Sequence, residues 1–149
     1  AYYWATIFQG YIDGFVRGRE EDSPNDLLNY GYAILRAIVA RALVCSGLLP
    51  TLGVHHHNRY NAYCLADDIM EPYRPYVDIL VFQIIKENKA SVLDNEMKSR
   101  LLSIPTLHVT IGGSNSPLMV AVTPTTSSLA KCFNGESRQV KYPSMKGNQ

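Results

Sequence analysis

The sequence lacks the cysteine pattern of a disulfide-stapled or zinc-binding fold. Its 149 residues contain three cysteines, an odd number, and no two of them form a CxxC pair. Small secreted scaffolds use even sets of cysteines and zinc knuckles use CxxC pairs, so neither class fits. We therefore expect a protein of the reducing cytoplasm.

Charge and long apolar runs are also scarce. Charged residues make up 18% of the chain, and the formal net charge is +1. A global basic signature for nucleic acid is thus absent, and any DNA contact has to come from a local patch. The longest apolar run, around residues 37–49, is interrupted by Arg41 and is shorter than the roughly 18 uncharged residues of a membrane span. We expect a soluble protein with no membrane partner.

The sequence has a mainly α-helical pattern, and its length suits one domain. Ser23 and Pro24 are expected to cap and begin the second helix, which is apolar on nearly all sides and therefore central and buried. Ser46 and Gly47 are expected to end it. The spacing of apolar residues predicts four helices in the first two thirds of the chain, over about residues 3–17, 23–45, 65–88 and 93–104.

After residue 105 the pattern changes. LHVTI alternates and GGSN is turn chemistry, so a short strand-turn element is predicted near residues 106–116. A last helix follows over roughly residues 117–133, and Pro124 is expected to kink or split it. The VKYP segment after that helix is interpreted as a strand or a strap. We predict that residues 1–143 form the folded domain and that residues 144–149 are a disordered tail.

A histidine cluster and a set of carboxylates lie close together in the middle of the sequence. On a helix the carboxylates would share roughly one face and would repel one another unless a cation joined them. Carboxylate oxygens suit Mg²⁺ or Mn²⁺, and imidazole adds a ligand or a proton carrier, a combination found where phosphodiesters are attacked. The sequence therefore indicates a divalent-metal site acting on phosphate. The residues concerned are His55, His56, His57, Asp67, Asp68, Glu71 and Asp78.

Structural explanations compete with the metal site. Asp68 and Glu71 fit a D-x-x-E capping box at the start of a helix whose first turn contains Pro72. Arg74 and Asp78 are four residues apart and fit an internal ion pair along a helix. Both explanations remain open at this stage.

The three adjacent histidines leave a further choice, because side chains alternate along an extended segment. Either His55 and His57 form an H-x-H pair, which is typical of a zinc hydrolase, or His56 works alone with distant carboxylates. A lone histidine is more often a packed or hydrogen-bonded side chain than a ligand. The residue pattern by itself does not choose between these alternatives.

Several motifs occur together in one order along the chain. LLNYGY occupies residues 27–32, a Pro-x-Leu-Gly turn residues 50–53, and L-x-x-D-x-x-E-x-Y-R-P residues 65–75, with His56 between the last two. TIGG, PLMVAV and SLAKCFNG follow toward the C-terminus. Over nearly all of its length the sequence resembles the CRISPR integrase, CRISPR-associated protein one, in the form found in type II systems.

The resemblance implies the mainly helical C-terminal domain of an enzyme that also has an N-terminal β domain. In that family a Glu, a His and a Glu or Asp hold Mg²⁺ or Mn²⁺. The motif match assigns the catalytic and metal-site histidine to His56, with His55 or His57 as fallback, and the second carboxylate to Glu71. Asp68 matches a supporting acidic position. The β domain and the first glutamate are expected to precede Ala1.

The resemblance also implies an activity and partners. The family acts in CRISPR adaptation, where the 3′-hydroxyl of captured foreign DNA attacks a phosphodiester at the edge of the repeat. Its implied partners are double-stranded DNA, CRISPR-associated protein two and, at full length, a second copy of itself. Arg36, Arg41 and Arg59 are candidate DNA contacts, and Arg74 and Asp78 are candidate supports of the site.

Without one of its three ligands, the segment alone is expected to be inactive. Two other functions remain open as alternatives to the integrase. The first is a catalytically dead helical module for DNA binding or protein interaction. The second is the zinc hydrolase that would use His55 and His57.

Overall fold

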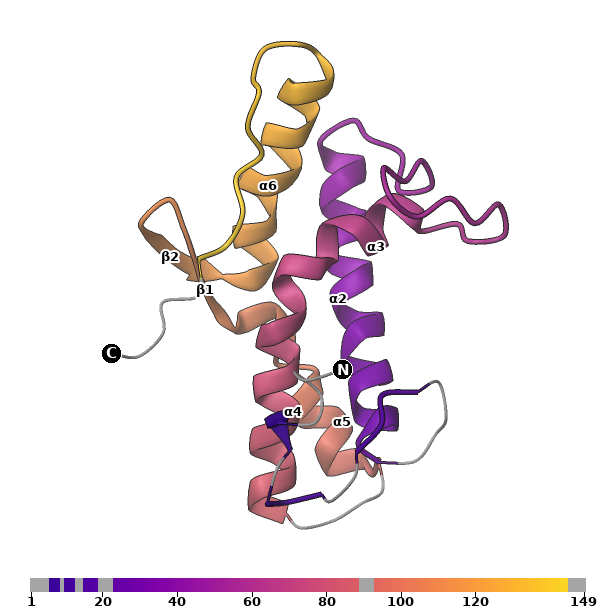
Figure 1. Ribbon diagram of the computed structural model, residues 1–149. Helices are drawn as coiled ribbons and strands as arrows, with labels where there is room; N and C mark the ends of the chain where they lie inside the picture. The colour runs from indigo at the N-terminus through magenta and orange to yellow at the C-terminus, as the bar shows by residue number, and fades with distance from the viewer. Residues whose placement is uncertain (1–5, 9, 13–14, 19–22, 89–92, 145–149) are drawn as a thin grey trace.

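The computed structural model describes residues 6–8, 10–12, 15–18, 23–88 and 93–144. In this part of the chain the protein is mainly helical with one small antiparallel sheet, which confirms the predicted fold class (Figure 1). The elements in order are α2 (Asn25–Cys45), α3 (Cys64–Met70), the 3₁₀ turn η1 (Glu71–Tyr73), α4 (Arg74–Asn88), α5 (Asn95–Leu101), the 3₁₀ turn η2 (Ile104–Thr106), β1 (His108–Ile111), β2 (Ser114–Pro117) and α6 (Leu118–Phe133).

Helix α2 is the centre of the fold, as its apolar pattern predicts. It contacts α3, α4, α5 and α6, and Leu27, Leu35 and Leu43 along it are fully buried. By length and composition alone it could cross a membrane, but the core helix of a soluble protein passes the same test. The helix ends at Cys45 and is followed, as predicted, by Ser46 and Gly47, the latter with the left-handed φ of 77° that favours glycine.

The predicted helix over residues 65–88 has the expected extent but is divided. Helix α3 is followed by η1 and then by α4, and Pro72 lies within the 3₁₀ turn. A proline has no N–H to donate, so the α-helical hydrogen-bond ladder is interrupted there. Tyr73 of η1 is fully buried, and its hydroxyl lies 2.6 Å from Oγ1 of Thr125 in α6. This contact joins the bent helix pair to α6.

The C-terminal third forms a hairpin, a helix and a strap. Strands β1 and β2 pair antiparallel, with Gly112 and Gly113 in left-handed conformation at the turn. The second strand was not predicted. Helix α6 is continuous through Pro124, so the predicted split is wrong. The strap, residues 139–144, has no regular secondary structure and runs back along α6; the backbone N–H of Lys141 donates to Oγ of Ser128.

Other boundaries also differ from the predictions. The helix predicted over residues 3–17 is confirmed only at residues 6 and 7 of the described part, because residues 10–12 form a turn with a left-handed Gly10 and residues 15–18 are irregular. Helix α2 begins at Asn25, and no side chain caps it. Helix α5 is shorter than predicted and is capped by Asp94.

The predicted division into a domain and a tail stays a prediction, although the backbone N–H of Ser144 donates to the carbonyl of Thr110 at 2.9 Å. The predicted disorder of residues 145–149 lies outside the described residues.

Candidate active site

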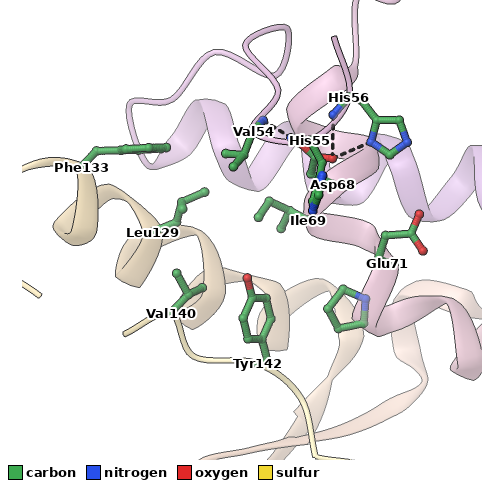
Figure 2. A pocket seen from close by; sticks show the side chains of 11 residues that line it. Val54, His55, His56, Asp68, Ile69, Glu71, Leu129, Phe133, Val140 and Tyr142 are labelled. Atoms are coloured by element: carbon green, nitrogen blue, oxygen red, sulfur yellow. Dashed lines mark hydrogen bonds and ion pairs between the residues drawn. The ribbon is translucent and has the colours of Figure 1, made fainter. Parts of the chain in front are cut away.

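The histidine loop, which we define as residues 53–57, is fastened to helix α3 by one carboxylate. Oδ2 of Asp68 accepts the backbone N–H groups of Val54 at 2.7 Å and His55 at 2.8 Å. Its Oδ1 accepts the backbone N–H of His56 at 3.2 Å and lies 2.5 Å from Nδ1 of the same histidine (Figure 2). Helix α3 begins at Cys64, so Asp68 lies inside the helix and the predicted capping box is wrong.

The space for this arrangement depends on Gly53. A Cβ atom built on Gly53 would lie 2.2 Å from the carbonyl oxygen of His56 and 2.7 Å from Cβ of Cys64. The loop therefore turns back against the start of α3 at a point where only a hydrogen atom fits.

Hydrogen bonding dominates the electrostatics of Asp68. Partial burial alone would raise its pKa, but the bonds from the His55 backbone, the His56 ring and the other loop N–H groups hold the pKa of Asp68 below its usual value. The carboxyl is therefore charged at neutral pH. A charged acceptor beside Nδ1 places the imidazole proton on that atom and leaves Nε2 as the atom able to bind a ligand or carry a proton.

His56 and Glu71 lie on the same side of Asp68. Figure 2 shows the imidazole of His56 and the carboxylate of Glu71 on one side of α3, opposite the side chains of Leu129 and Val140. The Glu71 side chain is 49% exposed, and its Oε1 lies 3.0 Å from Nη2 of Arg74 one turn further on. The structure thus brings the two principal candidates of the sequence onto one surface, with Asp68 and Arg74 holding them.

A cavity of about 570 Å³ lies beside this surface. The wall that carries the charged groups belongs to the histidine loop, α3 and η1, and the opposite wall belongs to α6 and the strap (Figure 2). The sequence did not predict the wall formed by α6 and the strap, because no local motif links these segments to the histidines. The lining residues are Val54, His55, His56, Asp68, Ile69, Glu71, Pro72, Leu129, Phe133, Val140 and Tyr142.

Two of the predicted carboxylates face away from this site. Asp67 is 5% exposed and accepts hydrogen bonds from Nε of Arg36 at 2.6 Å and from Nδ2 of Asn61 at 2.7 Å. Asp78 is 2% exposed and accepts from the hydroxyl of Tyr32 at 2.5 Å. The prediction that all four carboxylates share one face is therefore wrong.

The predicted pairing of Arg74 with Asp78 is replaced by the pair of Arg74 with Glu71. Asp78 instead holds Tyr32 of α2, and burial together with that contact raises the pKa of Tyr32 well above its usual range. This bond connects Asp78 to α2, and its role as a support of the site stays a prediction.

Within the described residues, no three side chains of His, Cys, Asp or Glu come close enough together to hold a metal ion. The H-x-H zinc site of His55 and His57 therefore has no third ligand in this part of the chain. The imidazole of His56 and the carboxylate of Glu71 have the nitrogen and oxygen chemistry that suits Mn²⁺ or Mg²⁺, but they are two ligands.

The three candidate DNA contacts are separated in the structure. Arg36 is bound to Asp67, Arg41 lies exposed on α2 beside a different cavity, and Arg59 follows the histidine loop with its guanidinium over the ring of Tyr60. Their contact with DNA stays a prediction.

The sequence matches one family of known proteins. Residues 5–104 match the family model described as "CRISPR associated protein Cas1". The chain is 31% identical over 141 residues to the CRISPR-associated endonuclease Cas1 of Neisseria meningitidis serogroup C (strain 8013), an alignment covering 93% of this chain and 46% of that protein. It is 33% identical over 134 residues to CRISPR-associated endonuclease Cas1 2 of Pyrobaculum aerophilum, covering 88% of this chain and 44% of that protein.

The fold has a solved counterpart. A structure described as "Casposase bound to integration product" superimposes with a TM-score of 0.71 at 23% identity, covering 89% of this chain and 44% of that one. The sequence identity is low, so the likeness concerns the fold. The chain spans about half the length of the curated relatives it matches.

Proposed function

The chain belongs to the family of CRISPR-associated Cas1 proteins, and on that premise we propose that it is the helical catalytic part of a metal-dependent DNA endonuclease and integrase of CRISPR adaptation. In the proposed reaction, the 3′-hydroxyl oxygen of captured DNA forms a new bond to a phosphorus at the edge of the repeat. The bond from that phosphorus to the 3′-oxygen of the repeat strand breaks, so one phosphodiester replaces another.

The observation that carries this proposal is the fixed imidazole of His56 beside the carboxylate of Glu71. Nδ1 of His56 is held 2.5 Å from Asp68, which fixes the ring and leaves Nε2 able to act. Carboxylate partners of this kind orient metal-binding histidines in many proteins and raise their basicity. Glu71 is kept on the same side by its ion pair with Arg74.

Each residue of the candidate site has a role in the proposed reaction. His56 offers Nε2 as a metal ligand or proton carrier, Glu71 offers carboxylate oxygens, and Asp68 and Arg74 position them. When bound, Mg²⁺ or Mn²⁺ supplies positive charge at the reacting phosphate and orients the attacking oxygen. Two ligands bind such an ion weakly, so the proposal includes a further carboxylate, from a glutamate that precedes Ala1 in a longer protein.

The proposal extends to the domain organisation and the partners expected from the family. The longer protein would carry an N-terminal β domain, form homodimers, and act in the cytoplasm with double-stranded DNA and CRISPR-associated protein two. The similarity to curated Cas1 endonucleases over 93% and 88% of this chain supports it.

The test is Mn²⁺-dependent joining of a labelled duplex to a CRISPR repeat by the full-length parent protein. We expect His56→Ala and Glu71→Ala to abolish joining. His57→Ala and Glu96→Ala, which alter an exposed histidine and an exposed carboxylate outside the cavity, should leave it intact. Joining that survives in the first two variants would contradict the assignment. DNA binding without joining in every form, the parent included, would favour the catalytically dead module.

A further inference from the structure

A second cavity, of about 550 Å³, lies between α2 and the bent pair of helices α3 and α4. We call it the arginine cavity, because three arginines from three separate segments meet there. Arg17 comes from the irregular segment before α2, Arg36 from α2 and Arg74 from the start of α4. The remaining lining residues are Gly18, Asn29, Tyr32, Ala33 and Met70.

Two of the three arginines are held over one aromatic ring. The guanidinium carbons of Arg17 and Arg74 lie 5.4 and 5.1 Å from the ring centroid of Tyr32. Nη1 of Arg17 also donates to the side-chain oxygen of Asn25 at 2.9 Å, and its Nη2 donates to that of Asn29 at 2.7 Å. The cations are therefore fixed in position before any ligand arrives.

The carboxylates that pair with these arginines stand outside the cavity. Asp67 contacts Arg36 through Nε, and Glu71 contacts Arg74 through Nη2. Among the described residues that line the cavity, none is acidic. Each of these two carboxylates is bonded to one nitrogen of its guanidinium, a group that carries five N–H donors in a planar fork.

Two of the guanidinium groups, those of Arg17 and Arg74, would gain from an anion in the cavity. Burial and the neighbouring charge of Arg74 both lower the pKa of Arg17, against the opposing effects of Tyr32 and Asp78. Nε of Arg74 is buried and has no acceptor among the described residues, and an unmade hydrogen bond of this kind costs about 1–3 kcal/mol. An acceptor-rich anion in the cavity would relieve both costs.

We propose that the arginine cavity binds one phosphate of a DNA strand whose neighbouring phosphate reacts beside Glu71. This inference rests on the proposed function. Guanidinium forks bind phosphate oxygens in bidentate fashion. Arg74 lies three residues after Glu71 and is ion-paired to it, so the cavity and the Glu71 carboxylate are neighbours. A DNA strand that passes Glu71 therefore brings its next backbone phosphates toward the arginine cavity. The cavity would thus set the register of the strand without reading its sequence.

The decisive variant is the charge-neutral pair Arg36→Gln with Asp67→Asn. It removes one cavity cation together with the buried carboxylate that holds it, so the net charge of the protein stays the same and no buried charge is left unpaired. The measurement is the affinity of the full-length parent protein for a labelled DNA of random sequence at several salt concentrations. Arg100→Gln in α5, which is paired with Glu87 and lies outside the cavity, is the control for loss of a surface cation.

We expect the double variant to bind DNA about tenfold more weakly at low salt. The slope of log K against log salt should become shallower by up to about 0.9 for duplex and about 0.7 for single-stranded DNA. The loss should be similar for unrelated sequences, because a phosphate contact carries no sequence information. Arg100→Gln should keep the parent's slope.

Further variants test the arginine cavity if the double variant fails to fold. Should the double variant fail to fold, Arg36→Lys keeps the charge and loses the fork, and we expect weaker binding with an unchanged slope. Parental affinity and slope in a folded double variant, or parental affinity in Arg36→Lys, would overturn the proposal. Arg36-dependent binding of inorganic phosphate with an unchanged DNA slope would place a free anion there and also overturn it. His56→Ala separates the two proposals, because it should lose joining and keep the parental slope.

Discussion

Asp68 and His56 form the closest polar contact of the candidate active site, with Oδ1 of the carboxylate 2.5 Å from Nδ1 of the imidazole. The same carboxylate accepts the backbone N–H groups of three successive loop residues. One side chain therefore fixes both the path of the histidine loop and the orientation of its ring. The position of His56 relative to Glu71 depends on a residue that need not touch the substrate.

Replacing Asp68 with Asn should impair metal binding more than folding. An amide nitrogen in place of one oxygen would face N–H donors, so at least one of the loop contacts is lost. Loss of such an orienting partner typically costs about 10–100-fold in metal affinity or activity. The measurement is the Mn²⁺ concentration for half-maximal joining by the parent protein.

The control for that experiment is Glu96→Gln, which alters an exposed carboxylate of α5. It should leave the Mn²⁺ requirement unchanged. An Asp68→Asn variant that joins DNA at the parental Mn²⁺ concentration would show that His56 does not depend on this contact.

The lowered pKa of Asp68 predicts an acid-sensitive loop. Because the pKa is lower in the folded state than its usual value of 3.8, the charged form stabilises the fold. This contribution is fully present above the unfolded value and is lost as the pH falls through the folded value. The free energy of unfolding should therefore fall more steeply between about pH 5 and about pH 3 in the parent than in Asp68→Asn. Equal slopes would contradict this assignment.

The 149-residue segment alone should fail to join DNA at a rate comparable with the full-length parent. Its described residues contain no group of three metal-ligating side chains, and a two-ligand site holds Mg²⁺ or Mn²⁺ weakly. The two proteins should be compared at equal concentration over a range of Mn²⁺. Equal strand-transfer activity would show that the proposed further carboxylate is not required.

The helices were predictable because their signals are local. The apolar pattern of α2 reflects the residues that it buries against four other helices, although Ala33, Ala37 and Val44 lie exposed along one side, and Gly47 follows its end. The strand Ser114–Pro117 was not predictable in this way, since its SNSP sequence has no β-branched or aromatic residue and it pairs only because the preceding turn returns the chain.

The candidate site was predictable in part. His56 and Glu71 do lie on one surface, as the motif spacing indicated. The residue pattern could not show which of Asp67 and Asp68 is bound to α2, because adjacent helical residues differ by about 100° and the orientation of α3 relative to α2 decides which one faces it. The partner of Asp67 is 31 residues away, and such a contact has no local signature.

Gly53 provides a last test, because the histidine loop needs the space that its missing side chain leaves. The loop carbonyl of His56 would lie 2.2 Å from an added Cβ, and the start of α3 blocks the other side. Gly53→Ala should therefore push the exposed histidine loop away from Asp68, with at least a tenfold loss of joining, roughly that of losing the orienting partner. The fold should survive, because the loop is exposed and the core residues of α2 and α4 are untouched.

Gly113→Ala in the β-turn is the matched control with the opposite expectation. Its added Cβ meets nothing within 4 Å, but its φ of +84° is strained for alanine, so it should cost about 1 kcal/mol of stability and leave joining intact. Joining rates and thermal unfolding of the two variants in the parent protein make the comparison. If Gly53→Ala joined DNA normally, the histidine loop would not need its contact with Asp68, and the placement of His56 at the reacting phosphate would have to be abandoned.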